Sequence, residues 1–162
     1  MNSLAKAIQE SYKTLKEKER KVLILYFGLA GKIHTLHSTG QKFGITRERV
    51  RQIRNAALKK VSQNPQKLLK RYIQKIQKAI KDAGGLSSQK TIIAKFVKDQ
   101  DEVSQNRLIF TLNLMPDIKK IKETKEHRTF WAQKAILIPQ IRTCQKQIRQ
   151  ILEKTQKPQK PE

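Results

Sequence analysis

Residues 43–61 read FGITRERVRQIRNAALKKV, and the spacing of the apolar side chains predicts an amphipathic helix. Upstream, TLHSTGQKF (35–43) is expected to form a shorter helix that begins at the N-cap residue Thr35. Gly44 would form a tight turn between the two helices, and Thr46 would cap the longer one. This order is typical of a helix-turn-helix that reads DNA. The inward face of the longer helix would consist of Val50, Ile53, Ala57, Leu58 and Val61.

The opposite face of this helix carries side chains that match the hydrogen-bonding edges of bases. Arginine pairs with guanine, glutamine or asparagine pairs with adenine, and glutamate accepts a hydrogen bond from cytosine. A helix that only grips phosphates has no need of Glu48. The alternative for Glu48 is an acid favoured by the positive end of the helix dipole. The predicted base-reading residues are Arg47, Glu48, Arg51, Gln52 and Asn55.

Composition points to a polyanion as the partner. The 162 residues include 36 Lys and Arg against 13 Asp and Glu, a formal net charge of +23, and both halves of the chain are basic. Such an excess attracts polyanions, so nucleic acid is the leading partner class and an anionic membrane surface the second. The apolar runs are too short to span a bilayer, and the N-terminus lacks a signal-peptide core. We expect a cytoplasmic, nucleoid-associated protein that binds double-stranded DNA and no membrane, as a monomer or a homodimer.

The sequence gives no indication of catalysis. It contains no glycine-rich phosphate loop, no clustered carboxylate pair and no Ser/His/Asp set. His34 and His37 have no third metal ligand nearby, and the single cysteine, Cys144, falls in an apolar stripe. We therefore expect a protein that is not an enzyme and that carries no metal and no cofactor.

The second half of the chain predicts a winged helix. SQNPQ (62–66) is polar, and Pro65 would end the preceding helix. Three further helical patterns follow, and then two short runs around a polar centre at 117–132, which favour a β-hairpin. The predicted fold is mainly α: a helix-turn-helix domain, a winged-helix domain of three helices plus a hairpin, and a C-terminal helix. The expected divisions are 1–63, 67–132, 133–154 for an amphipathic helix and 155–162 for a disordered tail.

This second half offers a further candidate DNA surface. The third helical pattern begins with polar side chains, and the hairpin carries basic ones that could follow phosphates. The alternative for the hairpin is a solvated charged loop. Phe130 and Trp131 are more typical of core anchors than of base-stacking groups. The residues of the predicted second DNA site are Ser104, Gln105, Asn106, Arg107, Lys122, Lys125 and Arg128.

LKEKERKVLILYFGL (15–29) and FGITRERVRQIRNAALKKV (43–61) closely resemble region 4 of the sigma-70 family of bacterial RNA polymerase sigma factors. In that family the region binds the −35 promoter element and packs on the polymerase β-flap, so the resemblance implies both partners. By position, it implies base contacts for Arg47, Glu48 and Gln52, with Arg51 approaching phosphates instead of a base. The expected contacts to the DNA backbone are Arg20, Thr35, Thr46, Arg49, Arg54 and Lys59.

The sequence also departs from the family. His37 and Ser38 stand where the family usually has acids, Thr39 replaces an aliphatic residue, and Arg54 replaces a glutamate. About fifteen residues precede the resemblance, too few for the region with which sigma factors open DNA, so we expect something other than a complete sigma factor. By its element order, Gly84-Gly85 and the run RTFWA (128–132), the second half looks like the HARE-type winged helices of some transcription proteins, including a polymerase accessory subunit.

Three functions remain open at this point. The first is a sequence-specific transcription regulator at a promoter or operator. The second is an RNA polymerase accessory factor that docks on the β-flap. One observation that favours it is the apolar segment VLILYF (22–27). The third is a binder of structured RNA, because net charge does not distinguish RNA from DNA.

Overall fold

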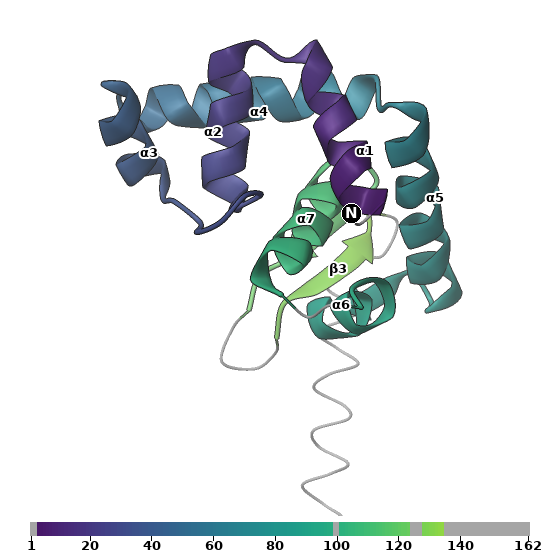
Figure 1. The fold of residues 1–162 in the computed structure, drawn as a ribbon. Coiled ribbons are helices and arrows are strands. Elements are labelled where there is room, and N and C mark those ends of the chain that lie inside the picture. The colour runs from purple at the N-terminus through teal and green to yellow at the C-terminus, as the bar shows by residue number, and fades with distance from the viewer. Residues whose placement is uncertain (1–2, 99–100, 124–127, 135–162) are drawn as a thin grey trace, which may run out of the picture.

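The computed structural model describes residues 3–98, 101–123 and 128–134. Almost all of the predicted C-terminal helix, the predicted tail and Lys125 lie outside these residues. The elements run in the order shown in Figure 1. They are α1 (Ser3–Ser11), a 3-10 helix η1 (Tyr12–Thr14), α2 (Glu17–Phe27), α3 (Leu36–Phe43), α4 (Arg47–Gln63), α5 (Lys67–Asp82), β1 (Leu86–Ser88), α6 (Gln89–Phe96), α7 (Glu102–Asn113), β2 (Ile118–Ile121) and β3 (Phe130–Gln133).

The first half forms the predicted helix-turn-helix, and local chemistry sets its helix ends. Gly28 closes α2 in the left-handed conformation, with φ of 62°, which glycine adopts at no steric cost. The Thr35 hydroxyl accepts a hydrogen bond from the Ser38 amide at the start of α3. At the start of α4, Thr46 does the same for the Arg49 amide. The predicted caps are therefore confirmed.

The second half has the element order of a winged helix. Helices α5, α6 and α7 pack with a three-stranded antiparallel sheet of strand order β1-β3-β2. The hairpin of β2 and β3 is confirmed, and Trp131 is a core residue that is 1% exposed. The strand β1 is not predicted by the sequence pattern, because three residues are too few to show an alternation. The fold class is confirmed as mainly helical with a small sheet.

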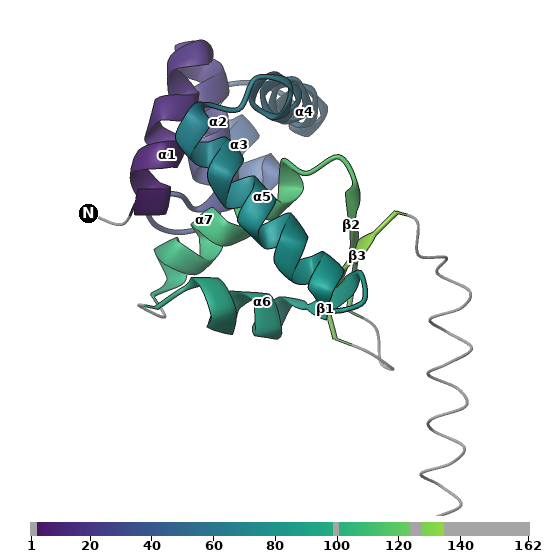
Figure 2. The ribbon, with the colours of Figure 1, turned by 90° about the vertical axis from the view of Figure 1, so that its right-hand side faces the viewer.

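Two hydrophobic clusters form the interior, and one of them joins the two halves. The first cluster combines α1 and α2 with Leu69 of α5, Phe110 of α7 and Leu114, which directly follows α7. The second lies between α5, α6, α7 and the sheet, around Ile76 and Trp131. Figure 2 shows α5 lying between the N-terminal helices and the sheet. The predicted divisions stay predictions, but the helices of the first half share a core with α5 and α7.

One buried hydrogen bond also connects the halves. The Asn106 side-chain amide in α7 donates to the Gly28 carbonyl at the end of α2, over 3.3 Å. The predicted linker is short, because α4 continues to Gln63 and α5 begins at Lys67. The helix-turn-helix is thus held against the winged-helix half by packing and by a polar contact.

Candidate nucleic-acid interface

A close backbone approach sets the turn between α3 and α4. A Cβ atom at Gly40 would lie 2.5 Å from the Ile45 carbonyl oxygen, closer than any side chain tolerates. The Ile45 amide in turn donates to the Gly40 carbonyl over 3.0 Å. Gly44 follows in the left-handed conformation, with φ of 62°. Because residue 40 is glycine, the chain before α4 can pack closely against α3. This close packing fixes the orientation of α4 relative to α3.

The helix α4 has the two faces that the sequence predicts. Val50, Ala57 and Val61 are at most 1% exposed and face the core, while Ile53 and Leu58 are half-buried. All five predicted base-reading residues are exposed, as is Arg49. The N-terminal half of α4 thus presents a mixed face of cations, an acid and amides to solvent, where a duplex could meet it.

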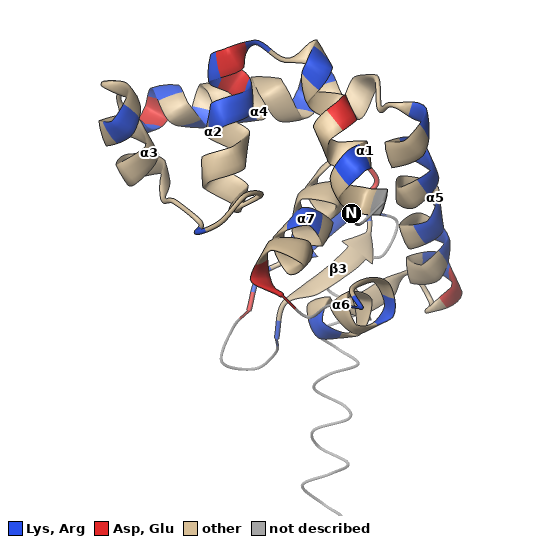
Figure 3. Cartoon of the chain, viewed as in Figure 1, with Lys and Arg blue, Asp and Glu red and all other residues tan. Residues whose placement is uncertain are grey.

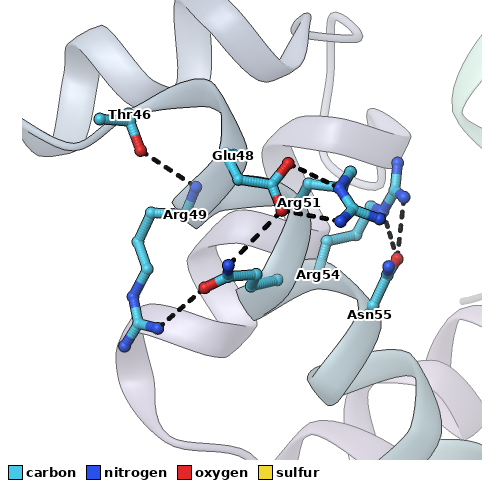
Figure 4. A network of polar contacts seen from close by, with 7 residues as sticks. Thr46, Glu48, Arg49, Arg51, Arg54 and Asn55 are labelled. Carbon is cyan, nitrogen blue, oxygen red and sulfur yellow. Dashed lines mark hydrogen bonds and ion pairs between the residues drawn. The ribbon is translucent and has the colours of Figure 1, made fainter.

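Glu48 is engaged by its neighbours on this face (Figure 4). Arg51 donates to both carboxylate oxygens of Glu48, from Nε over 2.8 Å and from Nη2 over 2.7 Å. Gln52 Nε2 approaches Glu48 Oε1 at 3.4 Å, and Arg49 Nη1 donates to Gln52 Oε1 over 3.1 Å. The hydrogen bonds from Arg51 are the main reason why the pKa of Glu48 lies below its ordinary value. The exposed face of α4 therefore carries a network of hydrogen bonds around an ionised glutamate.

A second cluster on α4 reaches a neighbouring helix. The Arg54 guanidinium lies 4.6 Å from the centre of the Tyr26 ring of α2, a cation–π contact. It also donates to Asn55 Oδ1, over 3.1 Å from Nε and 2.8 Å from Nη2. Figure 4 shows these two side chains side by side. Tyr26 was not among the predicted site residues, because its contact with Arg54 bridges two helices that local spacing does not relate.

An ion pair fixes the C-terminal half of α4. Lys60 Nζ lies 2.6 Å from Glu19 Oε1 of α2. Burial alone would raise the pKa of Glu19, but the hydrogen bonds from Lys60 and from the Lys16 amide outweigh it and lower the pKa. Among the predicted backbone contacts, Arg20 and Lys59 are exposed, as are the hydroxyl-bearing caps Thr35 and Thr46. Their positions are compatible with a duplex that approaches α4.

Two residues of the predicted second DNA site are buried by the fold. Ser104 is 5% exposed and Asn106 is 4% exposed, so both face the interior, against the prediction. The helix α7 begins at the cap Asp101, and its first turn holds Glu102. Hydrogen bonds from the Ser104 side chain and amide hold the pKa of Asp101 below its ordinary value, so its charge is retained. Two acids at this helix end disfavour contact with phosphate, and the DNA contacts predicted for this helix stay a prediction.

The other described residues of that site lie on two elements, the helix α7 and the hairpin of β2 and β3. Gln105 and Arg107 are half-buried on α7, whereas Lys122 and Arg128 are exposed beside β2 and β3.

Most of the apolar segment VLILYF (22–27) of α2 is interior: Val22, Leu23 and Phe27 are buried, and the rest is half-buried. This segment supports the core, which accounts for its apolar character without a partner.

Within the described residues, no helix is long and apolar enough to cross a membrane. No group of three or more His, Cys, Asp or Glu side chains is placed to hold a metal ion in that part of the chain.

Together, α3, the Gly40–Ile45 approach and α4 define a helix-turn-helix with a mixed polar face on its second helix. The family model described as "Sigma-70, region 4" matches residues 13–63, which contain this motif and α2. That match covers less than half of the chain, and it agrees with the resemblance found in the sequence.

Relatives align with the same part of the chain. RNA polymerase sigma factor SigA1 of Synechococcus elongatus is 43% identical over 74 residues, which cover 44% of this chain and 18% of that protein. SigA of Bacillus sp is 46% identical over 59 residues, which cover 36% of this chain and 16% of that protein. SigA of Lactococcus lactis subsp. cremoris is 44% identical over 59 residues, with the same two shares. The chain spans less than a fifth of the length of these relatives. No solved structure matches the chain.

Proposed function

We propose that this protein binds double-stranded DNA in a sequence-specific manner and regulates transcription, with α4 in the major groove of a promoter or operator element. The observation that carries the proposal is the exposed mixed face of α4. The match of residues 13–63 to sigma-70 region 4 and the net charge of +23 support it.

Each predicted contact has a role in this proposal. Phosphate contacts fix the register and orientation of α4, and base contacts select the sequence. The proposed base contacts are Arg47, Glu48, Arg51, Gln52 and Asn55, all of them exposed. The proposed backbone contacts are Arg20, Thr35, Thr46, Arg49, Arg54 and Lys59.

Two tasks for Glu48 in base selection follow from this proposal. It either accepts a hydrogen bond from cytosine or holds the Arg51 guanidinium in a fixed orientation toward a base. In both cases the carboxylate contributes to selection, which a helix that only grips phosphates would not need. A double-mutant cycle separates the tasks: if Glu48 acts through Arg51, Glu48→Ala and Arg51→Ala relax the same base pair and their effects are not additive.

Selection of bound duplexes from a random library, with the full chain, tests the proposal. We expect a preferred motif, and variants that contact bases should relax it at single positions. Lys59→Ala should instead weaken all duplexes equally and reduce the salt slope by about 1. Recovery of duplexes with no common motif would contradict sequence-specific binding. Tighter binding of structured RNA than of any duplex at physiological salt would favour the RNA alternative.

A second candidate function is association with RNA polymerase. The relatives that align with residues of the helix-turn-helix are named RNA polymerase sigma factors, which favours this partner. Docking on the β-flap would use the region 4-like surface without DNA. Polymerase core should then co-purify with the chain, and Arg47→Ala should not disturb the complex. Failure to co-purify in the presence and absence of promoter DNA would exclude this role.

A further inference from the structure

The helix α5 exposes a continuous row of cations on its outer side, visible in Figure 3. The opposite side of α5 packs into the protein through Leu69, Ile76 and Ile80, each at most 1% exposed. The only acid of the helix is Asp82, at its end. The cations, which we call the α5 basic stripe, are Lys67, Lys70, Arg71, Lys75, Lys78 and Lys81, and all six are exposed.

No ion pair engages the stripe within the described part of the chain. The ion pairs there join Lys21 with Glu17, Arg51 with Glu48 and Lys60 with Glu19, and none of them involves α5. Several stripe cations are three or four residues apart, a spacing at which like charges destabilise a helix by a few tenths of a kcal/mol per pair. The buried side of α5 already holds the helix in place. The stripe therefore works slightly against folding and suits a partner of opposite charge.

We infer that the α5 basic stripe binds the phosphate backbone of a second segment of duplex DNA, so that the protein bridges two segments. This inference rests on the proposed function, in which α4 binds the first segment. From Lys67 to Lys81 the stripe spans about 21 Å at 1.5 Å per residue. Each strand of a duplex carries one negative charge per about 3.4 Å of the helix axis, so one strand of a segment of this length carries about six phosphates, as many as the stripe has cations.

The position of the stripe favours a separate segment. The base-reading residues lie in the N-terminal half of α4, and α5 follows the far end of this helix of 17 residues, which is about 25 Å long. Figure 1 shows α5 leaving that far end and running away from α4, on the other side of the molecule from α3. A duplex seated on the start of α4 therefore leaves the stripe exposed for another segment.

The buried apolar side of α5 argues against a membrane surface as the occupant. An amphipathic helix that lies in a membrane interface needs its apolar side for the acyl chains. In α5 that side contributes Leu69 to one hydrophobic cluster and Ile76 and Ile80 to the other. The exposed side of α5 therefore provides cationic side chains without an apolar surface, and such side chains bind the phosphates of a nucleic-acid backbone.

Capture of a second duplex tests the inference. A duplex with the selected motif is immobilised, the full chain is bound to it, and capture of a labelled duplex without the motif is measured at about physiological salt. The test variant replaces all six stripe cations by glutamine. The control variant removes the same charge elsewhere, by glutamine at the exposed residues Lys6, Lys13, Lys32, Lys90, Lys95 and Lys98.

We expect the test variant to bind the immobilised motif and to capture at least tenfold less of the second duplex. The control variant should capture it as wild type does, or within about threefold. The salt slope of the second binding event should fall by up to about 5 in the test variant, at about 0.9 per lost contact.

Equal capture by the test variant and wild type would overturn the inference, as would equal loss in both variants, which would indicate net charge alone. Capture of duplex RNA or of anionic vesicles in place of duplex DNA would also overturn it. Absence of any preferred motif would instead count against the proposed function, because binding of any duplex to the stripe requires no motif.

Discussion

The helices α4 and α7 look alike in the sequence and differ in the fold. Each begins behind a capping side chain, Thr46 for α4 and Asp101 for α7, and each starts with polar residues. The first turns of α4 are exposed, whereas α7 buries Ser104 and Asn106 against the first half of the protein. The same kind of helix start is thus exposed to solvent in one place and buried between the two halves in the other.

The elements that pack around a helix start therefore decide whether its polar side chains are exposed or buried. At α4, the close approach of Gly40 to Ile45 directs the polar face outward, with Arg47 at its start. At α7, the Asn106 amide is used by the Gly28 carbonyl, and the acids of the first turn disfavour phosphate. Substitutions at the two helix starts and in α3 test this contrast.

Gly40→Ala should have the largest effect, because it disturbs the turn that orients α4 against α3 and leaves α7 unchanged. The new Cβ atom would meet the Ile45 carbonyl oxygen at 2.5 Å, so the backbone of the turn must shift. We expect a loss of about 3 kcal/mol in the free energy of unfolding, measured by urea denaturation, with loss of DNA binding. Gln41→Ala, at an exposed neighbour in α3, should change stability by less than about 0.5 kcal/mol. A stable Gly40→Ala protein with normal binding would contradict the turn geometry.

Asn106→Ala should have the next largest effect, and it tests the internal role of α7. It removes a buried hydrogen bond and leaves the Gly28 carbonyl with only the Gly31 amide, at 3.5 Å, as a donor, at a cost of about 2 kcal/mol in unfolding free energy. Asn113→Ala, at an exposed position in the same helix, is the control and should cost far less. If α7 read DNA, Asn106→Ala would instead preserve stability and reduce DNA affinity. Thermal unfolding and a binding titration on the same sample distinguish the two.

Thr39→Val should have the smallest effect, and of opposite sign. Thr39 is fully buried in α3, and its hydroxyl finds no hydrogen-bond partner among the described residues. The sequence also departs from the sigma-70 pattern here, where an aliphatic residue is usual. Valine has nearly the same shape without the unsatisfied hydroxyl, so we expect a gain of about 1 kcal/mol in unfolding free energy. Thr39→Ser keeps the hydroxyl and should lower stability. DNA binding should stay unchanged in both, and a less stable valine variant would refute this account.

Local chemistry was enough to predict the helix-turn-helix. Thr35 and Thr46 act within a few residues of themselves, so their caps could be predicted from the sequence. The pairing of Arg51 with Glu48 was also visible as an i, i+3 spacing on a helix, although the sequence analysis assigned both residues to bases.

Non-local contacts limited the rest of the prediction. The strand β1 pairs with β3 more than forty residues later, with Leu86 opposite Ala132, and its own three residues carry no pattern. The burial of Asn106 depends on α2, and the contact of Arg54 depends on Tyr26. Helix periodicity identifies which residues share a face, but it does not tell which element will cover that face.

The central claim is that α4 selects bases with its mixed face, and the most direct measurement compares Glu48→Ala with wild type. Both proteins are titrated with the selected duplex and with a panel of its single-base-pair variants at one salt concentration. We predict that wild type discriminates by about 1–3 kcal/mol at the position served by Glu48, and that Glu48→Ala loses this discrimination only there. An identical profile for the two proteins, or a flat profile for wild type, would contradict the claim.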